Sequence, residues 1–267
     1  MMLGLGGNLT LGGDVVERIF TPESLSNIAV WLKVGTNMTA DQNNGGGAVS
    51  HSTDAGDMYQ ADRINFWGAA GSTSINATQT DTTAKPRWST TTGELGGVAS
   101  ANANKHMHLS SNITFAADTD FTIVIRFRIN DFDAARAFLG NTTSEFFALN
   151  DENTIQVKTD GTESDFDSDE DLQVDKTATI IMTRSNGADG IISIHVRGED
   201  SSYFDTATGV PWGDEVEDAE EIVISKIMAS DDDTIEFDGT FMDVIIYNGT
   251  AVSPPQRKEL FDYLEAQ

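Results

Sequence analysis

The sequence predicts an all-β protein, a β-sandwich that ends in one short helix. Many short segments alternate apolar and polar residues, and clusters of Gly, Asn, Asp and Ser separate them. Only the segment 253–267 carries the residue spacing of a helix. Many short strands with turn signals and a single terminal helix are typical of a sandwich or barrel, and 267 residues fit one such domain.

Residues 1–20 form a Gly-rich segment with scattered apolar residues. This composition cannot build a core of its own, so we expect an N-terminal arm that lies against another surface. Thr21 is placed to cap a short turn with Pro22 at its first position. A strand is expected at 29–34, and the composition of 39–57 predicts a loop.

The stretch 62–88, "DRINFWGAAGSTSINATQTDTTAKPRW", places Trp67 and Trp88 at either side of small and polar residues. We expect the two indole rings to anchor two strands in the core, with the small-residue tract as their connection. Stacking of these rings on a sugar is the alternative interpretation.

The clearest strand is 120–130, "DFTIVIRFRIN". Every second residue from Phe121 to Ile129 is apolar, which is the period of a half-buried strand. Arg126 and Arg128 then belong to the opposite, outer face, where neighbouring acids can pair with them.

Further strands are expected along the rest of the chain. The segment 175–200 predicts two strands joined by "SNGADG", a hairpin connection. The last element is a helix at about 254–265, capped by Ser253 and started by two prolines, with Leu260, Phe261 and Leu264 on its apolar side. The remaining strand candidates are 135–141, 145–150, 154–160, 220–230 and 239–250.

In this order the segments resemble the concanavalin A-like lectin/glucanase superfamily, and within it the laminin-G-like branch of phage and bacterial surface proteins. The motifs that carry the resemblance are "SLSNIAVWLKV", the Trp67–Trp88 stretch, "GGVASANANKHMHLS", "DFTIVIRFRIN" and the closing "FDGTFMDVIIYNGTAVSPPQRKELFDYLEAQ". The resemblance spans about residues 21–267 and implies one jelly-roll sandwich there.

The chain departs from the pattern of that branch at two places. The Asp of its "W-x-D-x-SG" motif is missing in Trp67–Gly71, and its "FDG" turn is replaced by Asn102–Asn104. Metal or ligand functions that depend on those acids are therefore not carried over to this chain.

The charge limits the partners of the protein. Sixteen basic and 43 acidic residues give a net charge of −27, which disfavours nucleic acid and anionic membranes. Such a surface is typical of proteins from saline habitats. The lack of cysteine excludes disulfides, thiolate zinc sites and a cysteine nucleophile. No secretion signal and no membrane-spanning segment are predicted.

A catalytic centre of the glucanase type would place alternating carboxylates on one strand face. The nearest match is Glu163, Asp165 and Asp167, whose Asp, Ser and Gly neighbours predict a loop instead. No nucleophile elbow, P-loop or dinucleotide motif is present. These observations predict that the chain is not an enzyme.

A calcium site is the second candidate. An EF-hand loop beginning at Asp165 would need Gly and Glu where Glu170 and Lys176 stand, so an EF-hand is excluded. Acids in this spacing can still hold Ca²⁺, the one cofactor that we consider, although solvated charge is the alternative. The predicted ligands are Asp165, Asp167, Asp169 and Asp171, and Asp231–Asp233 form a second acidic group.

Histidines and aromatics supply the last candidates. His106 and His108 share a strand face, which allows metal ligation in principle, but the sequence shows no third ligand nearby. Trp212, Tyr203 and Tyr59 are the aromatic residues predicted to contact a glycan.

The resemblance, the acidity and the N-terminal arm favour a non-enzymatic structural protein of a phage virion. It would sit on the particle exterior, as capsid decoration or as a tail or fibre component, and would be oligomeric. Its expected partners are other virion proteins, bound through residues 1–20, and cell-surface glycans. The alternatives are a carbohydrate-binding module of a bacterial surface protein and a glycoside hydrolase.

Overall fold

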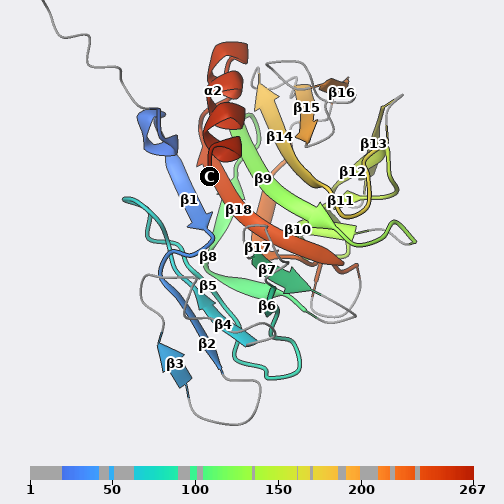
Figure 1. Ribbon diagram of the computed structural model, residues 1–267. Coiled ribbons are helices and arrows are strands. Elements are labelled where there is room, and N and C mark those ends of the chain that lie inside the picture. The colour runs from blue at the N-terminus through green and yellow to red at the C-terminus, as the bar shows by residue number, and fades with distance from the viewer. Residues whose placement is uncertain are drawn as a thin grey trace, which may run out of the picture.

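The computed structural model describes residues 20–41, 48–50, 63–89, 97–100, 105–133, 136–160, 162–168, 171–185, 191–198, 210–216, 220–231 and 235–267. They form the predicted all-β sandwich, two antiparallel layers of strands with one short helix at the C-terminal end (Figure 1). No helix among the described residues is both long enough and apolar enough to cross a membrane.

Near the centre of the first sheet lies the strand Phe121–Ile129, in which apolar and polar residues alternate most clearly. All neighbouring strands of this sheet pair antiparallel. Its order is β1 (Ile28–Lys33), β18 (Gly239–Asn248), β9 (Phe121–Ile129), β14 (Thr177–Ser185), β15 (Ile191–Gly198) and β16 (Val210–Val216). Strands β14 and β15 are the two that the sequence predicts on either side of "SNGADG".

The second sheet lies behind the first and is built largely from consecutive hairpins. Its order is β13 (Thr162–Asp167), β12 (Thr154–Thr159), β11 (Glu145–Leu149), β10 (Arg136–Thr142), β17 (Ile222–Ile227), β8 (Met107–Phe115), β5 (Ala77–Thr78), β4 (Arg63–Trp67), β2 (Met38–Asp41) and β3 (Ala48–Ser50). Strands β6 (Arg87–Ser89) and β7 (Gly97–Ser100) connect β4 to β18, so hydrogen bonding continues from one sheet to the other.

The inner faces of the sheets enclose the main core. Phe127, Phe138, Phe237 and Phe241 pack with ring centroids 4.5–6.3 Å apart, a spacing that favours aromatic contact. Trp67 and Trp88 are fully buried in the same core, as the packing interpretation predicts. The tract between them connects their two strands and contributes the short strand β5.

The helix α2 (Pro254–Glu265) covers the outer face of the first sheet, where it lies against β18, β9 and β14 (Figure 1). Its apolar side, Leu260, Phe261 and Leu264, packs on Val124 and Ile245. Strand β9 is therefore buried on both faces, and the prediction of a half-buried strand is wrong. The reason is that α2 shields from water the face of β9 that carries the arginines.

The two helical caps follow the sequence prediction. Ser253 and Gln256 form a capping box at the start of α2, after which Pro254 needs no amide partner. Thr21 and Ser24 do the same for the 3₁₀ turn η1 (Pro22–Ser24). Phe20, the last residue of the expected arm, packs edge-on against Tyr263 of α2, with ring centroids 6.3 Å apart. Residues 1–19 lie outside the described residues.

Two segments predicted as loops contain strands. Strands β2 and β3 occur within 38–50. The acidic segment Glu163–Asp167 belongs to β13, whose Phe166 is buried and pairs with Ile155 of β12. Asp, Ser and Gly disfavour strands, but cross-strand pairing and one buried aromatic side chain outweigh that preference here.

Asp243 lies in β18 beneath α2, only 1% exposed. The strand registers place it opposite Lys33 of β1 on one side and Arg126 of β9 on the other. Burial raises the pKa of Asp243 to about 6, while Arg126 and Lys33 act in the opposite direction. The carboxyl group is therefore easier to protonate in the folded than in the unfolded chain.

A pH prediction follows for Asp243→Asn. Because the folded-state pKa is raised, the contribution of Asp243 to stability is largest below pH 4 and is lost as the pH rises through 6. Asparagine does not titrate. We therefore expect the free energy of unfolding of the variant, relative to wild type, to increase by about 2 kcal/mol between pH 4 and pH 7.5. Urea unfolding at both pH values measures this difference.

The matched control is Asp175→Asn, which makes the same change at an exposed ion pair with Arg128. Parallel pH profiles for wild type and Asp243→Asn would contradict the assigned environment of Asp243.

Candidate functional site

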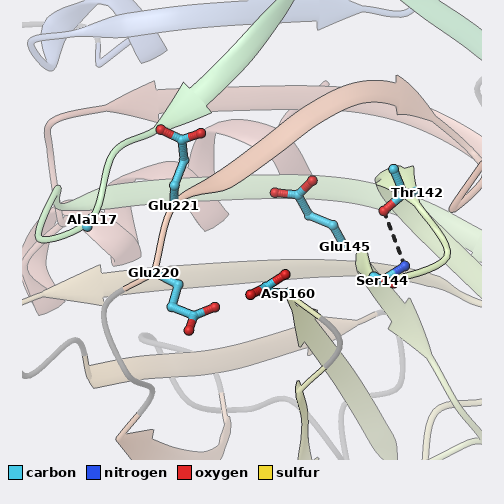
Figure 2. Close-up of a pocket in the computed structure, with 7 residues that line it drawn as sticks. All are labelled: Ala117, Thr142, Ser144, Glu145, Asp160, Glu220 and Glu221. Atoms are coloured by element: carbon cyan, nitrogen blue, oxygen red, sulfur yellow. Dashed lines mark hydrogen bonds between the residues drawn. The ribbon is translucent and has the colours of Figure 1, made fainter.

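Several strand ends of the second sheet meet at one end of the molecule. They are the end of β8, the β10–β11 turn, the β12–β13 turn and the start of β17. Together they line an open pocket of about 510 Å³ (Figure 2). The residues that line it are Ala117, Thr142, Ser144, Glu145, Asp160, Glu220 and Glu221.

The carboxylates of the pocket differ in their hydrogen bonds. Glu145 is half-buried and accepts from the Asn141 side chain at 2.8 Å and from the backbone N–H of Val223. Glu220 is also half-buried, but its Oε2 is buried without a hydrogen-bond partner. Figure 2 shows the carboxylates of Glu220 and Asp160 directed toward one another, whereas that of Glu145 is directed away from them, toward the side of Glu221. Glu145 is therefore fixed in place, whereas Glu220 has a buried oxygen that accepts no hydrogen bond in this structure.

Arg184 of β14 is hydrogen-bonded to the backbone of the segments that form the pocket. Its side chain is 2% exposed and donates to three backbone carbonyls, those of Ala116, Thr119 and Glu220, at 2.8–2.9 Å. The guanidinium also lies over the ring of Phe121, 5.0 Å from its centroid. Hydrogen bonds from a charged donor are stronger than neutral ones, so the turn after β8 and the start of β17 are held at a fixed separation.

The turns that form the rest of the wall have defined conformations. Asp160 adopts a left-handed backbone, φ 43°, at the tip of the β12–β13 hairpin, a conformation that Asp tolerates better than most residues. The backbone N–H of Ser144 donates to the Thr142 hydroxyl at 3.2 Å in the β10–β11 turn (Figure 2). Thr142 and Ser144 are exposed residues at the pocket rim, and each carries a hydroxyl.

The chemistry of the pocket is that of a hydrogen-bond acceptor. Carboxylates accept hydrogen bonds, and serine and threonine hydroxyls both donate and accept. None of the lining residues is Lys or Arg. The arrangement suits a ligand that offers several O–H or N–H donors and carries no negative charge.

The predicted calcium ligands lie elsewhere. Asp165 and Asp167 are on the exposed face of β13 together with Glu163. Asp165 accepts from Gln156 at 3.2 Å, Asp167 from Thr154 at 3.0 Å, and Glu163 pairs with Lys158. Asp171 accepts from Asn153 at 3.1 Å. Asp169 lies outside the described residues, as do Asp232 and Asp233 of the second acidic group.

Within the described part of the chain, no three His, Asp or Glu side chains come together as a metal site. The Ca²⁺ prediction for the aspartates therefore stays a prediction. The same holds for the aromatic candidates: Trp212 belongs to β16, of which only the backbone is described, and Tyr59 and Tyr203 lie outside the described residues.

Sequence reasoning did not identify Glu145, Asp160, Glu220 or Glu221 as site residues. Each stands beside a turn or at a strand end, where acids are common. The only signal was their recurrence at the ends of successive strand candidates. Without the strand order, nothing in the sequence indicates that these ends meet.

No protein-family model matches the sequence, and no curated protein matches it either. The chain is similar to the solved structure of a mutant GH54 α-L-arabinofuranosidase soaked with 4-nitrophenyl α-L-arabinofuranoside. The TM-score is 0.60 and the identity 11%, over 87% of this chain and 61% of that one. An arabinofuranosidase in complex with arabinofuranosyl-α-1,2-xylobiose gives 0.56 and 12%, over 85% and 58%.

A sialidase from Trypanosoma rangeli gives a TM-score of 0.52 at 9% identity, over 89% of this chain and 33% of that one. The chain thus spans less than two thirds of each of these proteins. At such identities the likeness shows the fold, a β-sandwich of the kind found in carbohydrate-active proteins. This fold is compatible with the concanavalin A-like superfamily, and no family match supports the laminin-G-like branch.

These structures contradict the prediction that the chain is not an enzyme. That prediction depended on the absence of a linear catalytic motif, whereas the solved structures that share the fold are mostly glycoside hydrolases and sialidases. The carboxylates that line the pocket of this chain come from separate strand ends, so a search for a linear motif would not find them.

Proposed function

We propose that the chain binds carbohydrate in the acidic pocket at the end of the second sheet. The observation that carries the proposal is the set of carboxylates and hydroxyls around one preformed cavity, with Arg184 fixing the walls. Its volume of about 510 Å³ is within the usual range of small-ligand pockets, roughly 300–1,000 Å³. The similarity to carbohydrate-active proteins supports the same class of ligand.

Fixed acceptors are well suited to sugars. A sugar presents many hydroxyl donors, and a carboxylate that is already oriented loses little side-chain entropy when it accepts from them. Glu145 meets this condition, since Asn141 and Val223 already hold it. Glu220 adds a carboxylate oxygen that lacks a donor in the unbound protein.

Glu145→Gln and Glu220→Gln test this site. Glutamine keeps the size of the side chain but removes the charge, and a hydrogen bond to a charged group is worth about 1.5–3 kcal/mol. We expect each variant to weaken glycan binding by about tenfold or more. Isothermal titration with arabino-oligosaccharides, or with the best ligand from a glycan array, measures the change.

Glu163→Gln is the matched control, because Glu163 lies on the exposed face of β13 and pairs with Lys158. Equal loss of affinity in all three variants would show that general charge matters and the pocket does not. Unchanged affinity in the two pocket variants would place binding elsewhere.

The charge of the pocket also predicts its selectivity. Acidic sugars such as sialosides carry a carboxylate, which the acids of the pocket repel, and no lining Lys or Arg compensates. Neutral arabinofuranosyl sugars avoid this cost. We therefore expect neutral arabinosides to bind more tightly than sialosides, even though arabinofuranosidases and a sialidase share the fold. A titration of sialyllactose at 150 mM salt that matched or exceeded the arabinoside affinity would contradict the assignment.

Glycoside hydrolysis is a second candidate, and a specific observation favours it. Glu145 and Glu220 share one pocket but have different hydrogen-bond environments. Hydrolases of sugars use two carboxyl groups in different roles, one as acid and one as nucleophile or base. For hydrolysis, the bond that links two sugars must lie between the carboxyl groups of Glu145 and Glu220.

The hydrolysis candidate is tested with 4-nitrophenyl α-L-arabinofuranoside, a substrate whose cleavage is followed by absorbance. If the wild-type chain cleaves it, we expect Glu145→Gln and Glu220→Gln each to lower kcat by about 10²-fold or more, as loss of a general acid or base does. Glu163→Gln should retain the wild-type kcat. Cleavage that persists in both pocket variants would exclude these carboxylates from catalysis.

The biological setting is a separate part of the proposal. A carbohydrate-binding module of a bacterial surface protein agrees with the fold and the pocket. The place on the exterior of a phage virion stays a prediction. The same holds for the binding of residues 1–20 to other virion proteins and for the oligomeric state. None of the comparisons bears on these predictions, nor on membership of the laminin-G-like branch.

A further inference from the structure

His106 and His108 bring two ring nitrogens together at the start of β8. Their Nε2 atoms are 3.2 Å apart, and the rings lie nearly perpendicular with centroids 4.9 Å apart. His106 is 4% exposed and His108 is half-buried. An uncharged pair in this arrangement requires one Nε2 to donate and the other to accept.

The backbone of both residues is held from several sides. The N–H of His106 donates to the Ala84 carbonyl at 3.2 Å, and its own carbonyl accepts from the buried Gln79 side chain at 3.2 Å. His108 lies between Thr78 of β5 and Lys226 of β17 in the sheet. The fold thus fixes the backbone positions from which both rings extend.

We propose that His106 and His108 are two ligands of a transition-metal site. Imidazole nitrogens bind Zn²⁺ at about 2.0–2.1 Å, and two nitrogens 3.2 Å apart at that distance subtend about 100° at the metal. That angle lies between the square-planar and the tetrahedral value. For both Nε2 atoms to bind the ion, the ring that donates from Nε2 in the uncharged pair must carry its proton on Nδ1 instead; the strands need not move.

The surroundings define the affinity and the metal. Within the described part of the chain, no third His, Asp or Glu completes a ligand set with the two imidazoles, so the described residues alone form an open site. Such an open site binds more weakly than a closed one with four protein ligands. Imidazole selects Cu²⁺, Ni²⁺ and Zn²⁺ over Ca²⁺ and Mg²⁺, and among these Cu²⁺ binds most strongly.

Some charged side chains near the histidine pair favour a bound cation and others disfavour it. Hydrogen bonds from Thr83 and, more weakly, the nearby His106 lower the pKa of Asp81, which keeps a negative charge beside the histidine pair. Lys226 stands opposite His108, but its Nζ donates to the Asn141 carbonyl at 3.3 Å. Lys105 donates to the Thr83 carbonyl. The carboxylate supports a bound cation, and the amines limit its affinity.

The test is titration of the full chain with CuCl₂ and with ZnCl₂ at pH 7.5 in a weakly coordinating buffer. We expect one Cu²⁺ or Zn²⁺ ion per chain and tighter binding of Cu²⁺ than of Zn²⁺. We expect no binding of Ca²⁺ to the histidine pair. His108→Gln should weaken Cu²⁺ binding at least tenfold. His195→Gln is the matched control, because His195 contacts Arg257 at 2.9 Å in a different part of the fold. This variant should leave the affinity for Cu²⁺ unchanged.

Electron paramagnetic resonance of the Cu²⁺-loaded wild type keeps the proposal testable if a variant fails to fold. Coupling to two imidazole nitrogens supports the site, and one nitrogen or none overturns it. The proposal is also overturned if the wild type does not bind Cu²⁺ at 1 mM, or if His108→Gln and His195→Gln lose affinity equally.

Discussion

The structure depends on apolar contact between the two sheets. The inner face of β9 supplies one side of this contact, and Phe115, Phe138 and Phe147 supply part of the other. Burying such side chains contributes about 25 cal/mol per Å² of apolar surface, which makes this interface the dominant favourable term of folding. The first sheet must also be covered on its outer side, because β9, β14 and β18 are buried on both faces. The helix α2 meets that requirement.

Arg184 connects this core with the pocket. Its guanidinium rests on Phe121, which in turn stacks on Phe115 with ring centroids 4.5 Å apart. A buried cation is costly unless it is hydrogen-bonded, and three backbone carbonyls, those of Ala116, Thr119 and Glu220, accept from this one. The position of the wall is therefore an outcome of core packing. A ligand that enters the pocket meets acceptors that the unbound fold has already placed.

Local patterns predicted much of the fold. The alternation from Phe121 to Ile129 identified β9, and Ser253 with the prolines after it identified the start of α2. The failures have a common cause. Strand β13 and the double burial of β9 both depend on partners distant in the sequence, namely β12 and α2. The pocket was not predicted for the same reason: Glu145 and Glu220 are far apart in the chain, and the pairing of β10 with β17 helps to bring them together.

High acidity made the site harder to find in the sequence, since any acid has a simple explanation as solvated charge. The structure separates the two kinds of carboxylate by what holds them. Asp165 and Asp167 contact side chains across an exposed strand face, so they can exchange those partners for water at little cost. Glu145 instead accepts from the backbone of a neighbouring strand while half-buried, so its position is part of the fold. A carboxylate fixed in this way, beside one whose buried oxygen lacks a hydrogen-bond donor, is what distinguishes the proposed site from the solvated acidic surface.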